Sequence, residues 1–235
     1  MDTAFIYTVK ANGITLACRA WGPEDAPPVL LLHCRGADGA DWTPIAEKLA
    51  ASPHPRRVYA PDLRGHGLSD RPGDYALESM SEDVYALLVA LGIAGAADVV
   101  GHSLGGTVAC LLAQRHPGAV RRLVLEDVPL PVPLDPPRPL AERPTGELPF
   151  DWAMLLATDE QRNAPDPVWR DHMGRITMPT LVIGGGPSSF IPQHEVAQVA
   201  ELVPDSRLVT LDAGHLVHEA RPEEFLAVVE PFLHG

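Results

Sequence analysis

The feature that most constrains the fold is the alternation of short apolar runs with longer segments of helical periodicity along this 235-residue chain. Residues 29–33, 122–125 and 180–183 are mainly apolar, which is typical of strands covered on both faces. The pattern predicts an α/β fold, a mostly parallel eight-stranded sheet flanked by helices. We expect strands at 5–9, 15–21, 29–33, 57–60, 98–101, 122–126, 180–184 and 207–211, and helices at 42–51, 81–91, 104–115, 193–202 and 222–233.

One segment interrupts the alternation. Residues 129–149 are too rich in proline for a regular helix or an interior strand, and two short helical patterns follow before the sheet pattern resumes at Met178. We therefore expect residues 129–176 to form a short proline-rich lid or cap insertion. Residues 1–128 and 177–235 then form the core of a single domain.

The charge balance limits the partners. The chain has 18 basic and 31 acidic residues, a formal net charge of −13, which argues against binding to nucleic acid or to an anionic membrane. The sequence does not open with a basic stretch followed by an apolar run, so we expect a cytoplasmic protein. The cysteines do not form a zinc-binding pair, so we expect no metal and no cofactor. A small-molecule substrate is the expected partner; oligomer formation is possible but cannot be predicted.

The strongest chemical signal lies at residues 99–107, Val-Val-Gly-His-Ser-Leu-Gly-Gly-Thr. It follows a strand pattern and begins a helical one, which is the context that a G-x-S-x-G nucleophile elbow requires. Small residues at Gly101 and Gly105 give clearance to a serine on a sharp strand-to-helix turn. That turn exposes the hydroxyl group of Ser103 and directs a helix N-terminus at the reacting centre.

With this elbow, the chain resembles the serine hydrolase branch of the α/β-hydrolase fold family. The resemblance extends to residues 31–36 (Leu-Leu-His-Cys-Arg-Gly), 62–70 (Asp-Leu-Arg-Gly-His-Gly-Leu-Ser-Asp) and 213–215 (Ala-Gly-His), in the family's order. It implies that Ser103 is the nucleophile and His215 the general base. It also implies an oxyanion hole formed by the backbone N–H groups of Leu104 and Arg35. Cys34 stands where the family usually has glycine.

The acid of the triad is missing from its usual place. Residues 185–192 read Gly-Gly-Pro-Ser-Ser-Phe-Ile-Pro, and Ser188 occupies the expected carboxylate position. Some haloalkane dehalogenases of this fold place the acid at the end of the preceding strand, where Glu126 and Asp127 stand. Alternation along a strand sends these two side chains to opposite faces, and we favour Asp127 over Glu126. A weakened dyad without an acid is a further alternative.

The resemblance implies a cofactor-free serine hydrolase that cleaves an ester, lactone or thioester of a small apolar substrate, with the acid relocated to the strand end before the lid. The candidate substrate-binding residues are Arg35, His102 and Trp152. Three alternatives stay open: a non-catalytic ligand-binding protein on the same fold, a carbon–carbon bond hydrolase, and a lyase or cyclase of secondary metabolism.

Overall fold

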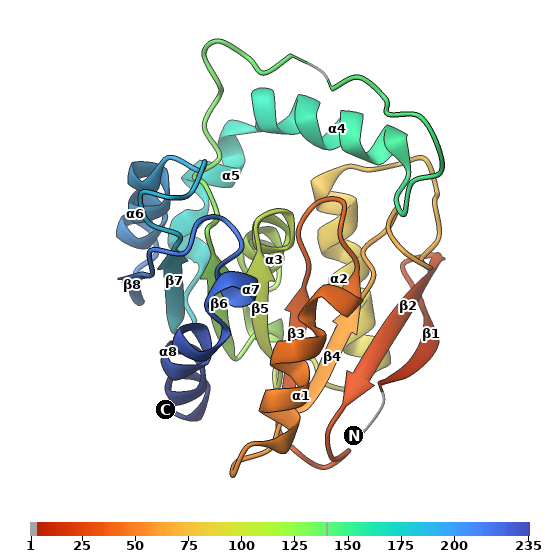
Figure 1. Ribbon diagram of the computed structural model, residues 1–235, viewed down its shortest axis with the longest axis vertical. Helices are drawn as coiled ribbons and strands as arrows, with labels where there is room; N and C mark the ends of the chain where they lie inside the picture. The colour runs from red at the N-terminus through yellow and green to blue at the C-terminus, as the bar shows by residue number, and fades with distance from the viewer. Residues whose placement is uncertain (1–3, 140) are drawn as a thin grey trace.

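A computed structural model describes residues 4–139 and 141–235. Its centre is an eight-stranded sheet with the strand order β1-β2-β4-β3-β5-β6-β7-β8 (Figure 1). Strand β2 is antiparallel to β1 and to β4, and all the other neighbours are parallel. The strands are β1 (Phe5–Ala11), β2 (Ile14–Trp21), β3 (Pro28–Leu32), β4 (Arg57–Pro61), β5 (Asp98–His102), β6 (Arg122–Glu126), β7 (Thr180–Gly184) and β8 (Ser206–Thr210). The predicted fold class is confirmed.

Helices cover both faces of the sheet. Buried side chains of α2 (Leu77–Ala90), α3 (Leu104–Arg115) and α6 (Gln193–Leu202) belong to one apolar core. Those of α1 (Thr43–Ala51) and α8 (Pro222–His234) belong to a second core. The inner strands are therefore buried on both sides, which explains the apolar runs at the centre of their sequences. The remaining short elements of the core are α7 (Val217–Ala220), η1 (Gly39–Trp42) and η2 (Pro117–Ala119).

The long connection between β6 and β7 contains an extended, proline-rich stretch followed by α4 (Trp152–Asn163), α5 (Pro167–Asp171) and η3 (Met173–Arg175). Figure 1 shows α4 above the sheet, with the extended stretch passing over it. Side-chain contacts fasten α4 to the start of α2. The Gln161 Oε1 atom accepts a hydrogen bond from the Leu77 amide at 2.9 Å, and Tyr75 Oη donates to Asp151 Oδ2 at 2.5 Å. The lid and its predicted limits, 129–176, fall within this connection, and its action as a lid stays a prediction.

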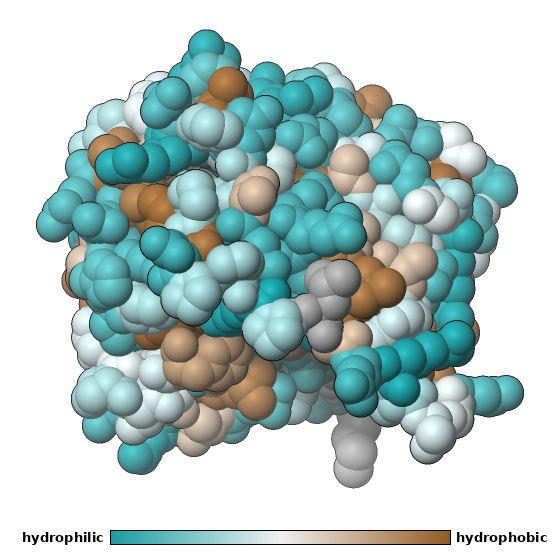
Figure 2. All heavy atoms as spheres, turned by 90° about the horizontal axis from the view of Figure 1, so that it is seen from above, coloured by the Kyte–Doolittle hydropathy of each residue, from teal (hydrophilic) through white to brown (hydrophobic). Residues whose placement is uncertain are grey.

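The face of the molecule that carries this connection is mainly hydrophilic, with hydrophobic residues in small, separate groups (Figure 2). The side chains of α4 that are buried are Met154, Thr158 and Asp159. Across the described ranges 4–139 and 141–235, no helix combines the length and the apolar character needed to cross a lipid bilayer.

Candidate active site

Ser103 lies on a sharp turn between β5 and α3. Its backbone angles, φ 52° and ψ −113°, are in a sparsely populated region for a residue with a side chain. The turn is possible because its neighbours are glycines. A Cβ atom on Gly105 would lie 2.3 Å from the Leu32 carbonyl oxygen, and one on Gly101 would lie 2.6 Å from the Gly105 carbonyl oxygen. The sequence pattern thus produces a serine with a strained backbone, and the next residue, Leu104, is the first residue of α3.

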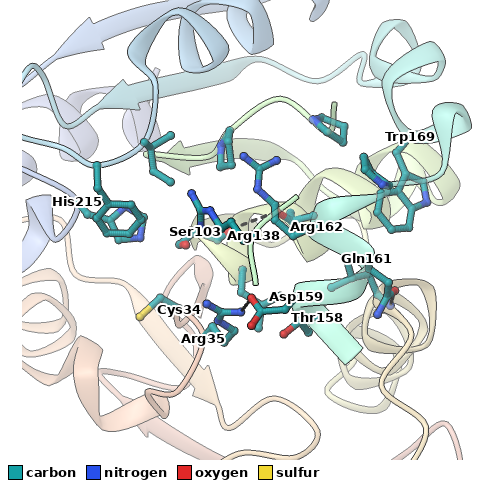
Figure 3. Close-up of a pocket in the computed structure, with 18 residues that line it drawn as sticks. Cys34, Arg35, Ser103, Arg138, Thr158, Asp159, Gln161, Arg162, Trp169 and His215 are labelled. Atoms are coloured by element: carbon teal, nitrogen blue, oxygen red, sulfur yellow. Dashed lines mark hydrogen bonds and ion pairs between the residues drawn. The ribbon is translucent and has the colours of Figure 1, made fainter. Parts of the chain in front are cut away.

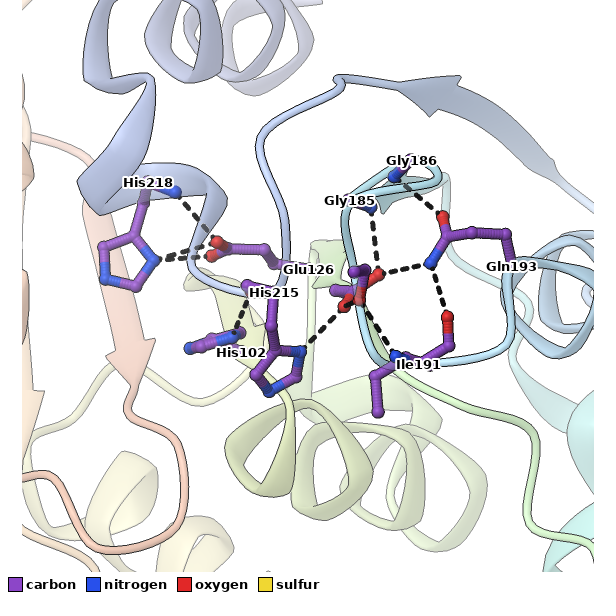
Figure 4. Close-up of polar contacts among 10 residues, drawn as sticks. His102, Glu126, Gly185, Gly186, Ile191, Gln193, His215 and His218 are labelled. Carbon is purple, nitrogen blue, oxygen red and sulfur yellow. Dashed lines mark hydrogen bonds and ion pairs between the residues drawn. The ribbon is translucent and has the colours of Figure 1, made fainter.

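Asp127 follows the last residue of β6 and adopts a positive φ of 48°, a conformation that aspartate tolerates better than most residues. Its buried carboxylate contacts the imidazole of His215, with 2.7 Å between Oδ2 and Nδ1. Three further donors reach this carboxylate: the Ser189 hydroxyl, the Gly185 amide at 2.9 Å and the Gln193 side-chain amide at 3.0 Å (Figure 4). Asp127 therefore holds His215 in one orientation, with Nδ1 toward the carboxylate.

The electrostatics of Asp127 favour its charged form. Burial raises the pKa of its carboxyl group, but hydrogen bonds from His215, Ser189, Gln193 and the Gly185 amide outweigh burial and hold the pKa below its ordinary value. The carboxylate is therefore ionised at neutral pH and can stabilise an imidazolium on His215.

Glu126, the neighbouring carboxylate, serves a different histidine. Its Oε1 atom accepts a hydrogen bond from the His218 amide at 2.9 Å, and both carboxylate oxygens lie 2.9 Å from His218 Nδ1 (Figure 4). Both side chains are buried. Although burial raises the pKa of Glu126 and lowers that of His218, their mutual attraction outweighs burial and shifts both in the opposite direction. The pair is thus a buried ion pair, and within the described residues Glu126 forms no hydrogen bond or ion pair with His215.

The loop after β3 carries Arg35, one of the two expected oxyanion donors. The Ala37 amide donates to the Cys34 carbonyl oxygen, which closes a turn in which Gly36 has a φ of 85°. His33 fixes this loop, because its Nδ1 atom donates to the Cys34 carbonyl oxygen at 2.7 Å and its Nε2 atom accepts from the Leu63 amide at 2.9 Å. Burial lowers the pKa of His33 to about 4, which keeps the imidazole neutral, as this bonding requires.

The Ser103 side chain faces a pocket of about 210 Å³ (Figure 3). The pocket lies between the sheet and the β6–β7 connection, which carries α4 and α5. Ser103, Leu104, His215, Cys34 and Arg35 line it at one end. Segments above the sheet supply the rest of the wall, with the polar or aromatic residues Arg138, Thr158, Asp159, Gln161, Arg162, Trp169 and Phe190. The expected nucleophile, the expected base and both expected oxyanion donors therefore line one cavity with room for a small molecule.

The environment of Cys34 favours the neutral form of its thiol. Burial, followed by the nearby Asp41 carboxylate, raises the pKa of its thiol to about 12. A thiol in that environment is protonated at neutral pH, and only the thiolate is an effective nucleophile.

Two expected substrate-binding residues do not line the pocket. His102 is fully buried, and its Nε2 atom lies 2.8 Å from the His215 carbonyl oxygen, so it supports the histidine loop instead. Trp152, at the start of α4, is absent from the wall, and Trp169 of α5 contributes the indole ring. Arg35 does line the pocket, as expected. Arg138, Asp159 and Arg162 were not predicted. The proline-rich stretch contains two arginines, Arg138 and Arg143, and no sequence signal singles out the one that lines the pocket.

Ser188 does not stand in for the acid. Its hydroxyl donates to Asp212 Oδ1 at 2.7 Å on the exposed side of the loop. The adjacent Ser189 is the residue whose hydroxyl reaches Asp127. The loop after β7 therefore supports a relocated acid instead of supplying one.

Side chains that could hold a metal gather beside the candidate active site, and one of them, Cys34, also lines its pocket. Three sets have ligand atoms within 4.8 Å of one another: Cys34, Asp41 and His102; His102, Glu126 and His218; and Asp41, His218 and Glu219. The second set contains the Glu126–His218 ion pair, whose members already satisfy each other. The expected absence of a metal stays a prediction.

Comparison with known proteins gives the same fold. Residues 27–164 match the family model described as the alpha/beta hydrolase fold. The chain is 27% identical over 255 residues to the Mus musculus protein named sn-1-specific diacylglycerol lipase ABHD11, with 90% of this chain and 82% of that protein covered. It is 30% identical over 245 residues to 2-hydroxymuconate semialdehyde hydrolase of Pseudomonas putida, with coverage of 88% and 86%. The crystal structure of the enol-lactonase from Burkholderia xenovorans LB400 superposes with a TM-score of 0.82 at 26% identity, covering 97% of this chain and all of that one.

Proposed function

Because the chain belongs to the alpha/beta hydrolase fold family, we propose that it is a cofactor-free serine hydrolase that cleaves an ester, lactone or thioester of a small substrate. The observation that carries this proposal is the 2.7 Å contact between Asp127 Oδ2 and His215 Nδ1, beside a pocket that also contains the strained Ser103. These features support a nucleophile and a base at one cavity, with an ionised acid buried behind the base.

In the proposed first half-reaction, the Ser103 Oγ atom attacks the carbonyl carbon of the substrate, and His215 Nε2 takes the hydroxyl proton. The carbonyl oxygen becomes negatively charged and accepts hydrogen bonds from the Leu104 and Arg35 amides. Asp127 stabilises the imidazolium that forms. The bond to the leaving group then breaks, and His215 returns its proton to the departing oxygen or sulfur.

The second half-reaction releases the acyl group. His215 removes a proton from a water molecule, whose oxygen attacks the acyl carbon bound to Ser103. The ester bond to Ser103 breaks, the serine regains a proton from His215, and the carboxylic acid leaves. No redox partner is needed, because the net reaction adds one water across the substrate bond.

The Asp127 contact also bears on the non-catalytic alternative. That alternative arises from the missing carboxylate in residues 185–192. A carboxylate from the end of β6 supplies what the loop lacks, and the loop supports it through Ser189 and Gly185. A binding protein has no need for such a supported acid beside a serine elbow.

Carbon–carbon bond hydrolysis is the second candidate, favoured by the likeness to 2-hydroxymuconate semialdehyde hydrolase. The two candidate reactions are distinguished by measuring turnover of a panel of substrates. The panel contains short-chain 4-nitrophenyl esters, thioesters, lactones and a vinylogous 1,5-diketone. We expect turnover of an ester, thioester or lactone by the wild-type protein and none by Ser103→Ala. Turnover of the diketone alone would favour the second candidate. Equal activity of the two proteins would overturn a serine mechanism.

A further inference from the structure

The pocket is positively charged within a strongly acidic chain. The chain carries a formal charge of −13, yet three arginines, Arg35, Arg138 and Arg162, line the cavity. Among the described residues, Asp159 is the only carboxylate in that lining. An excess of guanidinium groups around a small cavity attracts an anionic ligand.

Two of these arginines have carboxylate partners. Arg35 forms an ion pair with Asp159, and Arg162 forms one with Glu195 at 3.0 Å. Arg162 also donates to the Leu130 carbonyl oxygen at 3.2 Å, so it links α4 to the extended stretch. Their charges are largely balanced, and their donors are engaged in holding the pocket wall.

Arg138 is different. Within residues 4–139 and 141–235, its guanidinium group forms no ion pair and no hydrogen bond, although it lines the pocket. In Figure 3, Arg138 and Arg162 lie between Ser103 and Trp169. Arg138 is exposed to solvent, and its guanidinium group, with five donors, lines the same cavity as Ser103 without a partner among the described residues.

The backbone of Arg138 is held in place by Asn163, the last residue of α4. The Arg138 amide donates to Asn163 Oδ1 at 2.9 Å, and Asn163 Nδ2 donates to the Arg138 carbonyl oxygen at 2.8 Å. The Asn163 carbonyl oxygen accepts from the Leu134 amide at 3.1 Å. These three bonds tie an otherwise irregular, proline-rich stretch to α4 at the point where it presents Arg138.

We infer that the substrate carries a carboxylate a short distance from the scissile carbonyl group, and that Arg138 binds this carboxylate. The inference rests on the proposed hydrolase function and narrows its substrate class. A single unpaired guanidinium matches a group with one negative charge in a bidentate geometry. A phosphate carries about −1.5 to −2 charges at neutral pH, and one unpaired guanidinium would leave part of that charge unbalanced. The apolar residues of the wall, including Leu104, Ile191 and Phe190, suit a short hydrocarbon chain between the two groups.

This assignment replaces the expectation of a small apolar substrate. It also gives the proline-rich stretch a role in substrate specificity, because Arg138, the residue that binds the carboxylate, belongs to that stretch. The remainder of the reaction is unchanged: Ser103 attacks the same carbonyl carbon whether or not the distal carboxylate is present.

The test compares two substrates of the same length, 4-nitrophenyl pentanoate and the 4-nitrophenyl monoester of glutaric acid, in which a carboxylate replaces the terminal methyl group. The ratio of their kcat/KM values is measured after subtraction of the spontaneous rates. In the wild-type protein, we expect the glutaryl ester to be preferred by about tenfold or more, the effect of one charge-assisted hydrogen bond. In Arg138→Gln this ratio falls by a similar factor, and Arg138→Lys restores part of it.

The matched control is Arg143→Gln, an exposed arginine of the same connection that does not line the pocket. It should leave the ratio as in the wild-type protein. Absence of a preference, or a preference that survives in Arg138→Gln, overturns the carboxylate inference while ester turnover still supports the hydrolase. Labelling of Ser103 by a fluorophosphonate without turnover of the glutaryl ester also overturns the inference. A wild-type protein that neither labels nor turns over either ester overturns the proposed function itself.

Discussion

Asp127 Oδ2 lies 2.7 Å from His215 Nδ1, although 88 residues separate the two in the chain. The adjacent Glu126 points to His218. The division of roles follows from the backbone: Glu126 is the last residue of β6, and Asp127 turns away from the strand direction with a positive φ. Two neighbouring carboxylates thus reach two different histidines, one facing the pocket and one buried behind it.

This division predicts different effects for two isosteric substitutions. Asp127→Asn should lower kcat strongly, by a factor of about 10⁴ if the acid acts as in the best-studied serine triad. Glu126→Gln should leave a larger fraction of kcat in the molecules that stay folded, because its side chain contacts His218 instead of His215. Steady-state kinetics with circular dichroism as a folding check measures both. Equal small losses in both variants would contradict a relocated acid.

Ser188 and Ser189 offer a matched pair on the acid-supporting loop. Ser189→Ala removes a hydroxyl that donates to the buried Asp127 carboxylate and accepts from the Ile191 amide. We expect it to lower kcat by about tenfold, the effect of one hydrogen bond to a charged group. Ser188→Ala removes an exposed contact with Asp212 and should change kcat by less than about twofold. A larger loss in Ser188→Ala than in Ser189→Ala would show that the loop acts in another way.

The sequence was sufficient for most of the fold. Apolar runs located all eight strands, and the clearest runs belong to the inner strands β3, β6 and β7, which are buried on both faces. The start of α2 was missed: the periodicity suggests 81, whereas the helix begins at Leu77. The reason is non-local, since the Leu77 amide is capped by the side chain of Gln161, 84 residues further along the chain.

Site residues could be predicted where a local motif fixes the backbone conformation. They could not be predicted where contacts between residues distant in the sequence determine the position of a side chain. The glycines around Ser103 allow only one kind of turn, so the elbow could be located from its residues. Alternation of side chains along β6 favoured Asp127 over Glu126 as the acid. The local sequence contains no further signal that distinguishes these two residues. Arg138 reaches the pocket because the Asn163 side chain binds its backbone. The hydrophobic periodicity of a sequence cannot predict a contact of this kind.

The elbow should also be sensitive to one added methyl group. In Gly105→Ala, the new Cβ atom would lie 2.3 Å from the Leu32 carbonyl oxygen and 2.6 Å from that of His33, both backbone atoms. We expect a loss of about 1–3 kcal/mol or more in the free energy of unfolding, as for other overpacked positions. Gly118→Ala, whose Cβ would meet nothing within 4 Å, should be nearly neutral. Urea denaturation measures both; equal stability of the two variants would contradict the close approach of α3 to β3.

The buried Glu126–His218 pair predicts a defined pH dependence of stability. The pKa of His218 is raised above 6.5, so its contribution is complete below that value and is lost as pH rises through the raised pKa. The pKa of Glu126 is lowered below 4.5, so its contribution is complete above that value and is lost as pH falls through the lowered pKa. The pair therefore stabilises the fold most between pH 4.5 and 6.5.

Glu126→Gln tests this window. We expect a loss of about 3–5 kcal/mol within it, typical of a broken buried ion pair, and a smaller loss at higher pH as His218 becomes neutral in both proteins. Asp41 and Glu219 also raise the pKa of His218. The stability difference between the wild-type protein and Glu126→Gln should therefore begin to decrease only above pH 6.5. Glu223→Gln, which removes the exposed ion pair with Lys48, is the control and should show little effect at any pH. A constant loss for Glu126→Gln across the whole range would contradict a charged His218.

The central claim, an activated Ser103 supported by His215 and Asp127, is tested most directly by the rate of covalent labelling with a fluorophosphonate, which needs no knowledge of the substrate. The account predicts stoichiometric labelling of Ser103 in the wild-type protein, none in Ser103→Ala, and strongly slowed labelling in His215→Ala and Asp127→Asn. A folded wild-type protein that does not label, or an Asp127→Asn variant that labels at the wild-type rate, would contradict it.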